Sequence, residues 1–183
     1  MESLQGYFLV AAPRLAESNF YHSVVLMVSH NEQGALGLVI NRPSNSPIGE
    51  VWEQLTEEEC DHDAPIYIGG PVEGPLMAVH QEADCAEQEI VQGVHFTTDR
   101  DHLGTILAQH ERPFRIFSGY SGWSPGQLER ELKAGGWLTV PATIDWIFSD
   151  DDELWKQVSQ AIGLDLLQRT LRPKHVPLDA SAN

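Results

Sequence analysis

Residues 119–123, with the sequence GYSGW, have the residue types and spacing closest to a serine nucleophile. Such a serine sits in a G-x-S-x-G turn between a strand and a helix, where small neighbours relieve a strained backbone. Here Trp123 stands where the last small residue belongs, and the next helix is expected only after Ser124. The one histidine downstream of Ser121 is His175, which leaves little from which to build a Ser–His–Asp triad in the hydrolase order. No catalytic residue is predicted.

The same stretch is typical of a helix start. Ser124 as N-cap would place Pro125 in the first helical position and Gln127 in the third, which is the Ser-x-x-Gln pattern of a capping box. Trp123 before the cap and Leu128 in the fourth position have the spacing of a hydrophobic staple. The sequence therefore predicts a strand over residues 114–118, a glycine turn over 119–122 and a helix over 125–134.

Three turn motifs at strand ends are candidates for a binding surface. Backbone N–H groups beside a helix start can hold a phosphate or carboxylate, and residues 69–71 (GGP) offer a second glycine loop beside 119–123. Neither loop matches a P-loop or a dinucleotide fingerprint. Residues 41–43 (NRP) end a third strand. The predicted site consists of Asn41, Arg42, Pro43, Gly69, Gly70, Pro71, Gly119, Tyr120, Ser121, Gly122 and Trp123.

Metal-ligand patterns are weak throughout the chain. The segment CDHD at residues 60–63 lacks the second ligand pair that a structural zinc site needs, and a solvated acidic loop is the favoured interpretation. No metal and no cofactor is predicted. Two cysteines, Cys60 and Cys85, are too few for a disulfide framework and favour reduced thiols, with a single bridge left open.

The charge balance limits the choice of partner. Eleven Lys+Arg against 27 Asp+Glu give a net charge of −16, which repels a phosphate backbone and makes direct binding of nucleic acid unlikely. No apolar run approaches the roughly 18 residues that span a bilayer, and residues 7–12 are interpreted as a first strand rather than a signal peptide. A cytoplasmic protein is expected, without membrane association and with its oligomeric state open.

Periodicity gives the elements that would position these motifs. Apolar, β-branched runs predict strands over residues 7–12, 23–30, 35–40, 66–68, 76–80, 90–97 (with a bulge at Gly93), 114–118 and 137–140. Helices are predicted over 47–55, 98–111, 125–134 and 149–163, with Ser46 and Thr98 as caps, Leu55 on a buried stripe and Gly163 as a stop. Hairpins mixed with helical crossovers indicate one α+β domain over residues 1–171 with a mostly antiparallel or mixed sheet and about four helices. Residues 172–183 are expected to form a flexible tail.

Several of these stretches together resemble the YqgE/AlgH family of bacterial proteins. They are residues 6–13 (GYFLVAAP), 34–43 (GALGLVINRP), 67–72 (YIGGPV) and 119–129 (GYSGWSPGQLE), and the resemblance extends from about residue 4 to 165. It implies a small single-domain α+β protein with a bifurcated or barrel-like sheet flanked by helices. The family carries a transcriptional-regulator label but no assigned biochemical activity. Its usual motif reads Gly-Tyr-Ala-Gly-Trp, so Ser121 stands at an alanine position and is a poor candidate for a nucleophile.

The expected function is binding without catalysis. The protein is expected to bind a protein or small-molecule partner through the three motifs, with at most an indirect regulatory role. One alternative is a transcriptional regulator that acts on DNA. Another is an enzyme that uses Tyr120 or Ser121 in a pocket formed by the glycine loop and a helix N-terminus, which would require a titratable group within hydrogen-bond reach of either hydroxyl.

Overall fold

The computed structural model describes residues 2–12, 20–109, 112–149 and 151–171. In chain order the elements are β1 (Tyr7–Ala11), β2 (Val24–Asn31), β3 (Gly34–Val39), β4 (Pro43–Pro47), α1 (Ile48–Thr56), β5 (Pro65–Ile68), β6 (Val72–His80), the 3₁₀ turn η2 (Ala83–Cys85), β7 (Gln88–Val91), β8 (Val94–Thr97), α2 (Arg100–Ala108), β9 (Phe114–Trp123), α3 (Gln127–Lys133), β10 (Trp137–Pro141), α4 (Ile144–Ile147) and α5 (Asp151–Leu171). The predicted α+β class is confirmed. The predicted tail, 172–183, lies outside the described residues.

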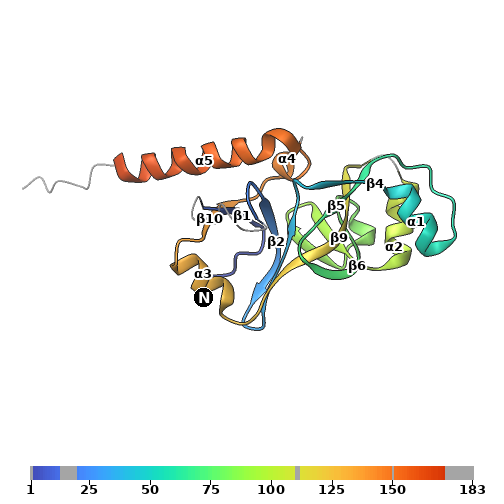
Figure 1. Cartoon of the computed structure of the whole chain (residues 1–183), viewed down its shortest axis with the longest axis horizontal. Helices are drawn as coiled ribbons and strands as arrows, with labels where there is room; N and C mark the ends of the chain where they lie inside the picture. Colours follow the sequence, from blue (N-terminus) through green and yellow to red (C-terminus); the bar gives the residue numbers. More distant parts are fainter. Residues whose placement is uncertain (1, 13–19, 110–111, 150, 172–183) are drawn as a thin grey trace, which may run out of the picture.

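Ten strands form one open, mostly antiparallel sheet. Its main path runs β10-β1-β2-β3-β9-β6-β8-β7, while β4 and β5 lie off this path and β5 joins β9 in parallel. The sheet divides at β9, because its last residues pair with β3 and its first residues pair with β6 and β5. The bifurcated sheet implied by the family resemblance is therefore present, and it is not closed into a barrel (Figure 1).

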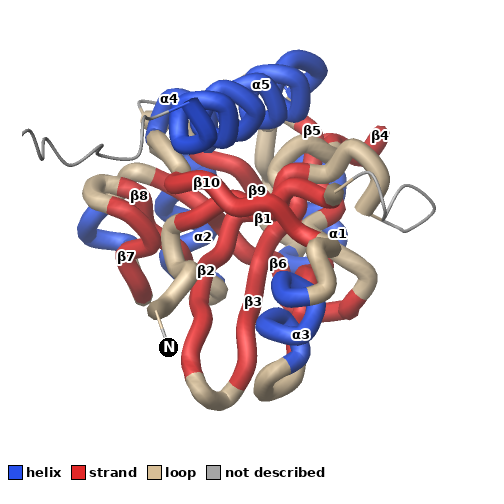
Figure 2. Tube along the Cα trace, turned by 90° about the vertical axis from the view of Figure 1, so that its left-hand side faces the viewer, coloured by secondary structure: helices blue, strands red, loops and turns tan. Residues whose placement is uncertain are grey.

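Helices bury three apolar clusters against this sheet. The longest of the described helices, α5, lies across the part of the molecule that holds β1 and β10 (Figures 1 and 2). Helices α1 and α2 lie at the opposite end (Figure 1). The spacing of Leu154, Trp155, Val158 and Ile162 predicts one buried stripe on this helix; Leu154, Val158 and Ile162 are buried in the largest cluster, and Trp155 is partly buried against it. A second cluster joins α1 and α2 to β6, and a third places α3 against β1, β2 and β3.

The start of α1 differs from the prediction. Residues 43–47 form strand β4 rather than a connector, and the N-cap of α1 is Pro47, which has no side-chain capping bond, instead of Ser46. The loop before β5 supplies the missing partners. The N–H of Ile48 donates to the carbonyl of Ala64, and the N–H of Gly49 donates to the carbonyl of His62. Leu55, predicted to be buried, is 60% exposed.

Four further local predictions were wrong. Gly93, with φ +77°, lies between β7 and β8 in a hairpin turn and is not a bulge. Asp99, not Thr98, caps α2 by accepting from the N–H groups of Asp101 and His102. Helix α5 continues through Gly163 to residue 171, and the short helix α4 was not predicted.

The largest difference concerns the GYSGW stretch, which is not a turn. Strand β9 continues through residues 119–123, with Gly119 at φ +72° where the strand passes from one half of the sheet to the other. The backbone of Gly69 and Gly70 crosses it at this point. A Cβ on Gly69 would overlap the carbonyl oxygen of Gly119, and a Cβ on Gly70 would overlap the backbone of Tyr120. Glycine is required on both segments because two main chains touch there.

We expect Gly119→Ala to lower the free energy of unfolding by about 2–4 kcal/mol. The added Cβ would lie 2.9 Å from the carbonyl oxygens of Gly70 and Val72 at a positive φ, so strain and overpacking add. Gly163→Ala is the matched control, because a Cβ at that helical position meets nothing within 4 Å. It should raise the free energy of unfolding by about 0.5–1 kcal/mol. Urea denaturation of both variants measures the difference, and equal effects would contradict the proposed crossing.

Candidate functional site

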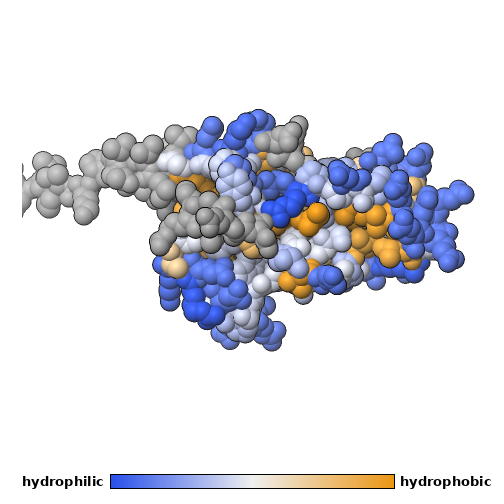
Figure 3. Space-filling model, in the orientation of Figure 1, coloured by the Kyte–Doolittle hydropathy of each residue, from blue (hydrophilic) through white to orange (hydrophobic). Residues whose placement is uncertain are grey.

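The glycine crossing borders an open hollow of 430 Å³. Its lining residues are Ile68, Gly70, Pro71, Val72, Glu73, Gly74, Ser118 and Gly119. Ile68 is 42% exposed and Val72 is 38% exposed, so two aliphatic side chains face solvent beside bare glycine backbone. Hydrophobic residues reach the surface over the half of the molecule where Figure 1 places β5, β6 and β9 (Figure 3). Glu73 is the one ionisable side chain among these lining residues.

Tyr120 explains the second glycine of the G-Y-x-G motif. A Cβ on Gly122 or on Gly74 would lie 3.2 Å from ring carbons of Tyr120. The half-buried ring therefore lies against two glycines, one from β9 and one from β6. The motif thus serves two contacts, since Gly119 admits the crossing chain and Gly122 makes room for the aromatic ring.

Ser121 is used inside the fold. Its side chain is buried, with 1% of the residue exposed, and its hydroxyl donates a hydrogen bond of 3.1 Å to the carbonyl oxygen of Gly69. A carbonyl oxygen cannot remove a proton from the hydroxyl as a general base would. The bond instead joins β9 to the segment that crosses it. The hydrogen-bond partner of Ser121 therefore does not support a role as nucleophile.

The side chains of Asn41 and Arg42 open toward a different hollow. The amide of Asn41 donates to the carbonyl of His22 and accepts from the N–H of Val24, both at 2.9 Å, and Arg42 donates to the hydroxyl of Ser23 at 2.7 Å. The backbone of the NRP motif meets β5 through a hydrogen bond of 2.9 Å from the N–H of Ile68 to the carbonyl of Arg42, and Pro43 lies opposite Tyr67 in the strand register. The structure thus brings residues 69–71 and 119–120 together, while Asn41 and Arg42 line a neighbouring hollow of 330 Å³.

Trp123 is part of a cluster centred on a carboxylate that the sequence analysis missed. Glu131 accepts from the indole N–H of Trp123 at 2.9 Å, from that of Trp137 at 2.8 Å and from the amide of Gln127 at 3.0 Å. Burial acts to raise the pKa of Glu131, but these hydrogen bonds outweigh it and hold the pKa below its ordinary value. The only sequence signal was the spacing of four residues between Gln127 and Glu131, which face one another on a helix.

The capping box predicted for α3 is half present. The helix begins at Gln127, and its N-cap is Gly126 instead of Ser124. The Gln127 side chain does reach back to accept from the N–H of Ser124 at 3.1 Å. Trp123 and Leu128 lie in one apolar cluster, as a staple requires. The bond of the capping box thus spans a turn over residues 124–126, and the helix begins only after that turn.

A second carboxylate attaches α3 to the sheet. The Nδ1 atom of buried His30 accepts from the N–H of Leu4 at 3.0 Å, so Nε2 carries the proton and donates to Glu129 at 3.2 Å. The backbone N–H of Glu129 and the bond from His30 hold the pKa of this carboxyl below its ordinary value. Glu129 and Glu131 together fix the helix beside β9 and β10.

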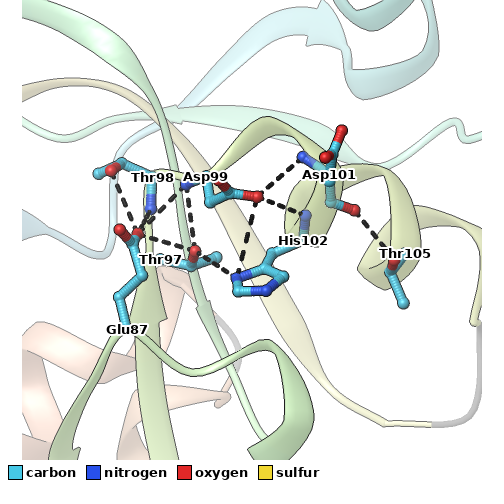
Figure 4. A network of polar contacts seen from close by, with 7 residues as sticks. All are labelled: Glu87, Thr97, Thr98, Asp99, Asp101, His102 and Thr105. Atoms are coloured by element: carbon cyan, nitrogen blue, oxygen red, sulfur yellow. Dashed lines mark hydrogen bonds and ion pairs between the residues drawn. The ribbon is translucent and has the colours of Figure 1, made fainter.

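At the start of α2, another carboxylate accepts several hydrogen bonds and so holds this helix in place (Figure 4). The Glu87 carboxylate accepts from the backbone N–H of Thr98, from the Thr97 hydroxyl at 2.8 Å and from the N–H of Asp99 at 3.2 Å. These bonds, the one from Thr98 foremost, hold the pKa of Glu87 below its ordinary value. His102 lies beside them, with Nδ1 at 3.4 Å from the Thr97 hydroxyl. The network caps the start of α2.

His80 lies buried beneath this network. It pairs across strands with His95, and its Nδ1 accepts from the N–H of Glu82 at 3.2 Å. Burial, followed by the positive charge of His95 and His102, lowers the pKa of His80 to about 4. Among the described residues no group of three or more His, Cys, Asp and Glu side chains could hold a metal ion. Cys60 and Cys85 are both free thiols, which settles the question of a bridge between them.

The architecture and its glycine crossing define a small single-domain α+β protein with an open, bifurcated sheet. Residues 8–167 match the AlgH-like protein family, and the chain belongs to that family. No helix in the described part of the chain is long and apolar enough to span a membrane.

Relatives extend over nearly the whole chain. A protein of Shewanella loihica named only UPF0301 protein is 36% identical over 185 residues, covering 96% of this chain and 100% of the relative. Another UPF0301 protein, from Thioalkalivibrio sulfidiphilus, is 38% identical over 87% of this chain and 89% of its own. The solution structure of AlgH from Pseudomonas aeruginosa superimposes with a TM-score of 0.76 at 36% identity, covering 95% of this chain and 96% of that one. Protein DIP2367 of Corynebacterium diphtheriae, with 22% identity, a TM-score of 0.71 and coverage of 88% and 87%, shares the fold.

We expect Glu131→Gln to lower the free energy of unfolding at pH 7 by about 1–3 kcal/mol, because two indole donors lose a charged acceptor. The pKa of Glu131 is lowered in the fold, so its contribution is present above the unfolded value of about 4.3 and is lost as the pH falls through the folded value. Denaturation at pH 7 and pH 3 should therefore show a smaller pH effect in the variant than in wild type. Glu50→Gln on α1 is the exposed control, and a loss as large as that of Glu131→Gln would contradict the assignment.

We expect His80 to make the protein sensitive to mild acid. Its pKa falls from an unfolded value near 6.5 to about 4, so the unfolded chain binds one more proton between these values. The free energy of unfolding should then decrease by about 1.4 kcal/mol per pH unit as the pH falls from about 6.5 toward 4. His80→Asn keeps an acceptor for the N–H of Glu82 but does not titrate, and it should flatten this slope. A wild-type stability that does not change over this pH range would refute the assignment.

Proposed function

We propose that this protein acts by binding a protein partner at the hollow beside the glycine crossing, without catalysis. The observation that carries the proposal is the combination of exposed Ile68 and Val72 with bare backbone from Gly70, Gly74 and Gly119. Aliphatic side chains next to glycine backbone give a surface that another chain can approach closely, and exposed apolar patches commonly mark such contacts.

The chemistry of the hollow supports binding more than reaction. Glu73 is its one ionisable lining residue, and the neighbouring hydroxyl of Ser121 is buried and donates to a carbonyl. An acid, a base and a nucleophile within reach of one another are what an enzyme site needs. A regulatory role would then be indirect, through the bound protein.

A regulator that contacts DNA is the second candidate, and the charge of the chain weighs against it. The net charge of −16 repels phosphate, and the hollow itself contributes a carboxylate and no cation. We further propose a cytoplasmic location, which the two free thiols support, since reduced cysteines are usual in a reducing compartment.

The test uses exposed residues, so that folding is preserved. The double variant Ile68→Ser/Val72→Ser removes both aliphatic groups from the hollow, and Leu55→Ser removes a side chain that is 60% exposed on α1. Tagged wild type and both variants are incubated with lysate of the source organism, and the retained proteins are quantified by mass spectrometry. We expect wild type and Leu55→Ser to retain the same partner and the double variant to lose at least about 90% of it, which is a change of about 1.4 kcal/mol or more.

Two results would refute the proposal. One is a set of retained proteins that is identical for all three chains. The other is a salt-dependent mobility shift of DNA at low ionic strength that the double variant does not alter, which would favour the DNA-binding alternative.

A further inference from the structure

The second hollow, which contains Asn41 and Arg42, combines an aromatic wall with two cations. Its 330 Å³ is lined by Tyr21, His22, Ser23, Asn41, Arg42, Trp155 and Lys156. These residues come from the turn before β2, the end of β3 and the first turns of α5. None of the lining residues is acidic, although the chain holds 27 acidic and only 11 basic residues. The charged residues that line this hollow are thus opposite in sign to the net charge of the protein.

The aromatic wall consists of three neighbouring rings, one stacked pair and one tilted pair. The Tyr21 and His22 rings stack with centroids 3.8 Å apart and an interplanar angle of 21°, and the His22 and Trp155 rings lie 4.0 Å apart at 36°. Tyr21 is 55% exposed, which leaves the outer end of the stack open to solvent. Stacking against such a wall favours a flat, unsaturated ligand.

The backbone at this wall is held in an uncommon conformation. His22 has φ +54°, which is uncommon for a residue other than glycine. The side chain of Asn41 holds this turn in place with two hydrogen bonds. Its NH₂ group donates to the carbonyl of His22, and its oxygen accepts from the N–H of Val24. Asn41 therefore fixes the position of the His22 ring between its two neighbours.

The cations stand next to this wall. Arg42 is oriented by its bond to the hydroxyl of Ser23, which is itself buried, with 1% of the residue exposed. Lys156 pairs with Glu153 at 2.9 Å, but both side chains are more than half exposed, so the pair contributes little and an anion can compete for the ammonium group. The indole N–H of Trp155 is buried and has no hydrogen-bond partner among the described residues. The site therefore holds positive charge from Arg42 and Lys156.

We propose that this hollow is a binding site for a planar aromatic anion. The ring of the ligand stacks on the exposed ring of Tyr21, at the outer end of the wall, and its carboxylate or phosphate is held by Arg42 and Lys156. This site is separate from the hollow at the glycine crossing and does not depend on the proposed function. The carboxylate and phosphate forms share the same chemistry, and the probes below distinguish them.

The experiment titrates the full chain with small probes, and binding is measured by isothermal calorimetry or from amide chemical shifts. The probes are indole-3-carboxylate, adenosine monophosphate, indole and inorganic phosphate. We expect at least one of the two ring-bearing anions to bind at least about tenfold more tightly than indole or phosphate alone, because the wall and the cations act together. The stronger of the two shows which combination of ring and anionic group the site prefers. Equal affinities for all four probes, or no saturable binding of either ring-bearing anion, would overturn the proposal.

Variants at exposed positions locate the site. Lys156→Gln should lower the affinity for the ring-bearing anion about tenfold, which corresponds to about 1.4 kcal/mol for one charge-assisted contact. Tyr21→Ser should lower this affinity about three- to tenfold. Lys133→Gln, an exposed lysine on α3, is the matched control and should have no effect. The Ile68→Ser/Val72→Ser variant should also bind the anion normally, which separates this site from the partner-binding hollow. Equal losses in Lys156→Gln and Lys133→Gln would show nonspecific charge attraction and refute the site.

Discussion

The contact on which the rest of the structure depends is the crossing of two main chains, Gly69–Gly70 against Gly119–Tyr120. Strand β9 pairs with β6 and β5 before this point and with β3 after it, so one strand belongs to both halves of the sheet. The segment that follows β5 must pass over β9 where it bends. The N–H of Gly69 donates to Ser118 and its carbonyl accepts from both the N–H of Val39 and the hydroxyl of Ser121, so the crossing is bonded on every side. A side chain on either glycine would separate the two halves.

Carboxylates attach the helices to this sheet. Glu131 collects two indole donors, Glu129 meets His30, and Glu87 caps the start of α2. In a chain of net charge −16, these three acids are distinguished from the solvated ones by their donors, which favour the charged form and lower each pKa. The acidic composition therefore has two parts, a structural one that fixes α2 and α3 and a surface one that repels polyanions.

Local patterns predicted the parts of the fold that local physics decides. The apolar runs gave β1, β2, β3 and β10, and the apolar spacing of Leu154, Val158 and Ile162 gave the buried face of α5. The GYSGW stretch was misassigned because glycine and serine favour turns when nothing else acts on them, and the crossing segment 50 residues earlier in sequence acts on them here. The prediction of the α1 cap was wrong for the same reason, since the first N–H groups of this helix donate to carbonyls of a loop distant in sequence.

The candidate site was predictable only in part. The glycines of 69–71 and 119–122 were found together because glycine marks close backbone approach, and the structure brings these two segments into contact. Their purpose could not be read from sequence, because the contact depends on the path of β9. Glu131, Trp155 and Lys156 were missed as site residues, since they lie on ordinary helices and gain meaning only from what packs beside them.

The NRP motif links the two hollows through its two chemical halves. Its backbone holds β5 through the bond from the N–H of Ile68 to the carbonyl of Arg42, and so supports the rim of the glycine-lined hollow. Its side chains turn the other way, where Asn41 holds the strained His22 turn and Arg42 reaches Ser23. A ligand that orders the side chains of Asn41 and Arg42 would contact a motif whose main chain is hydrogen-bonded, at Arg42, to Ile68 on the rim of the glycine-lined hollow. A short motif at the end of a buried strand thus joins the aromatic, cationic hollow to the apolar one across a single strand pairing.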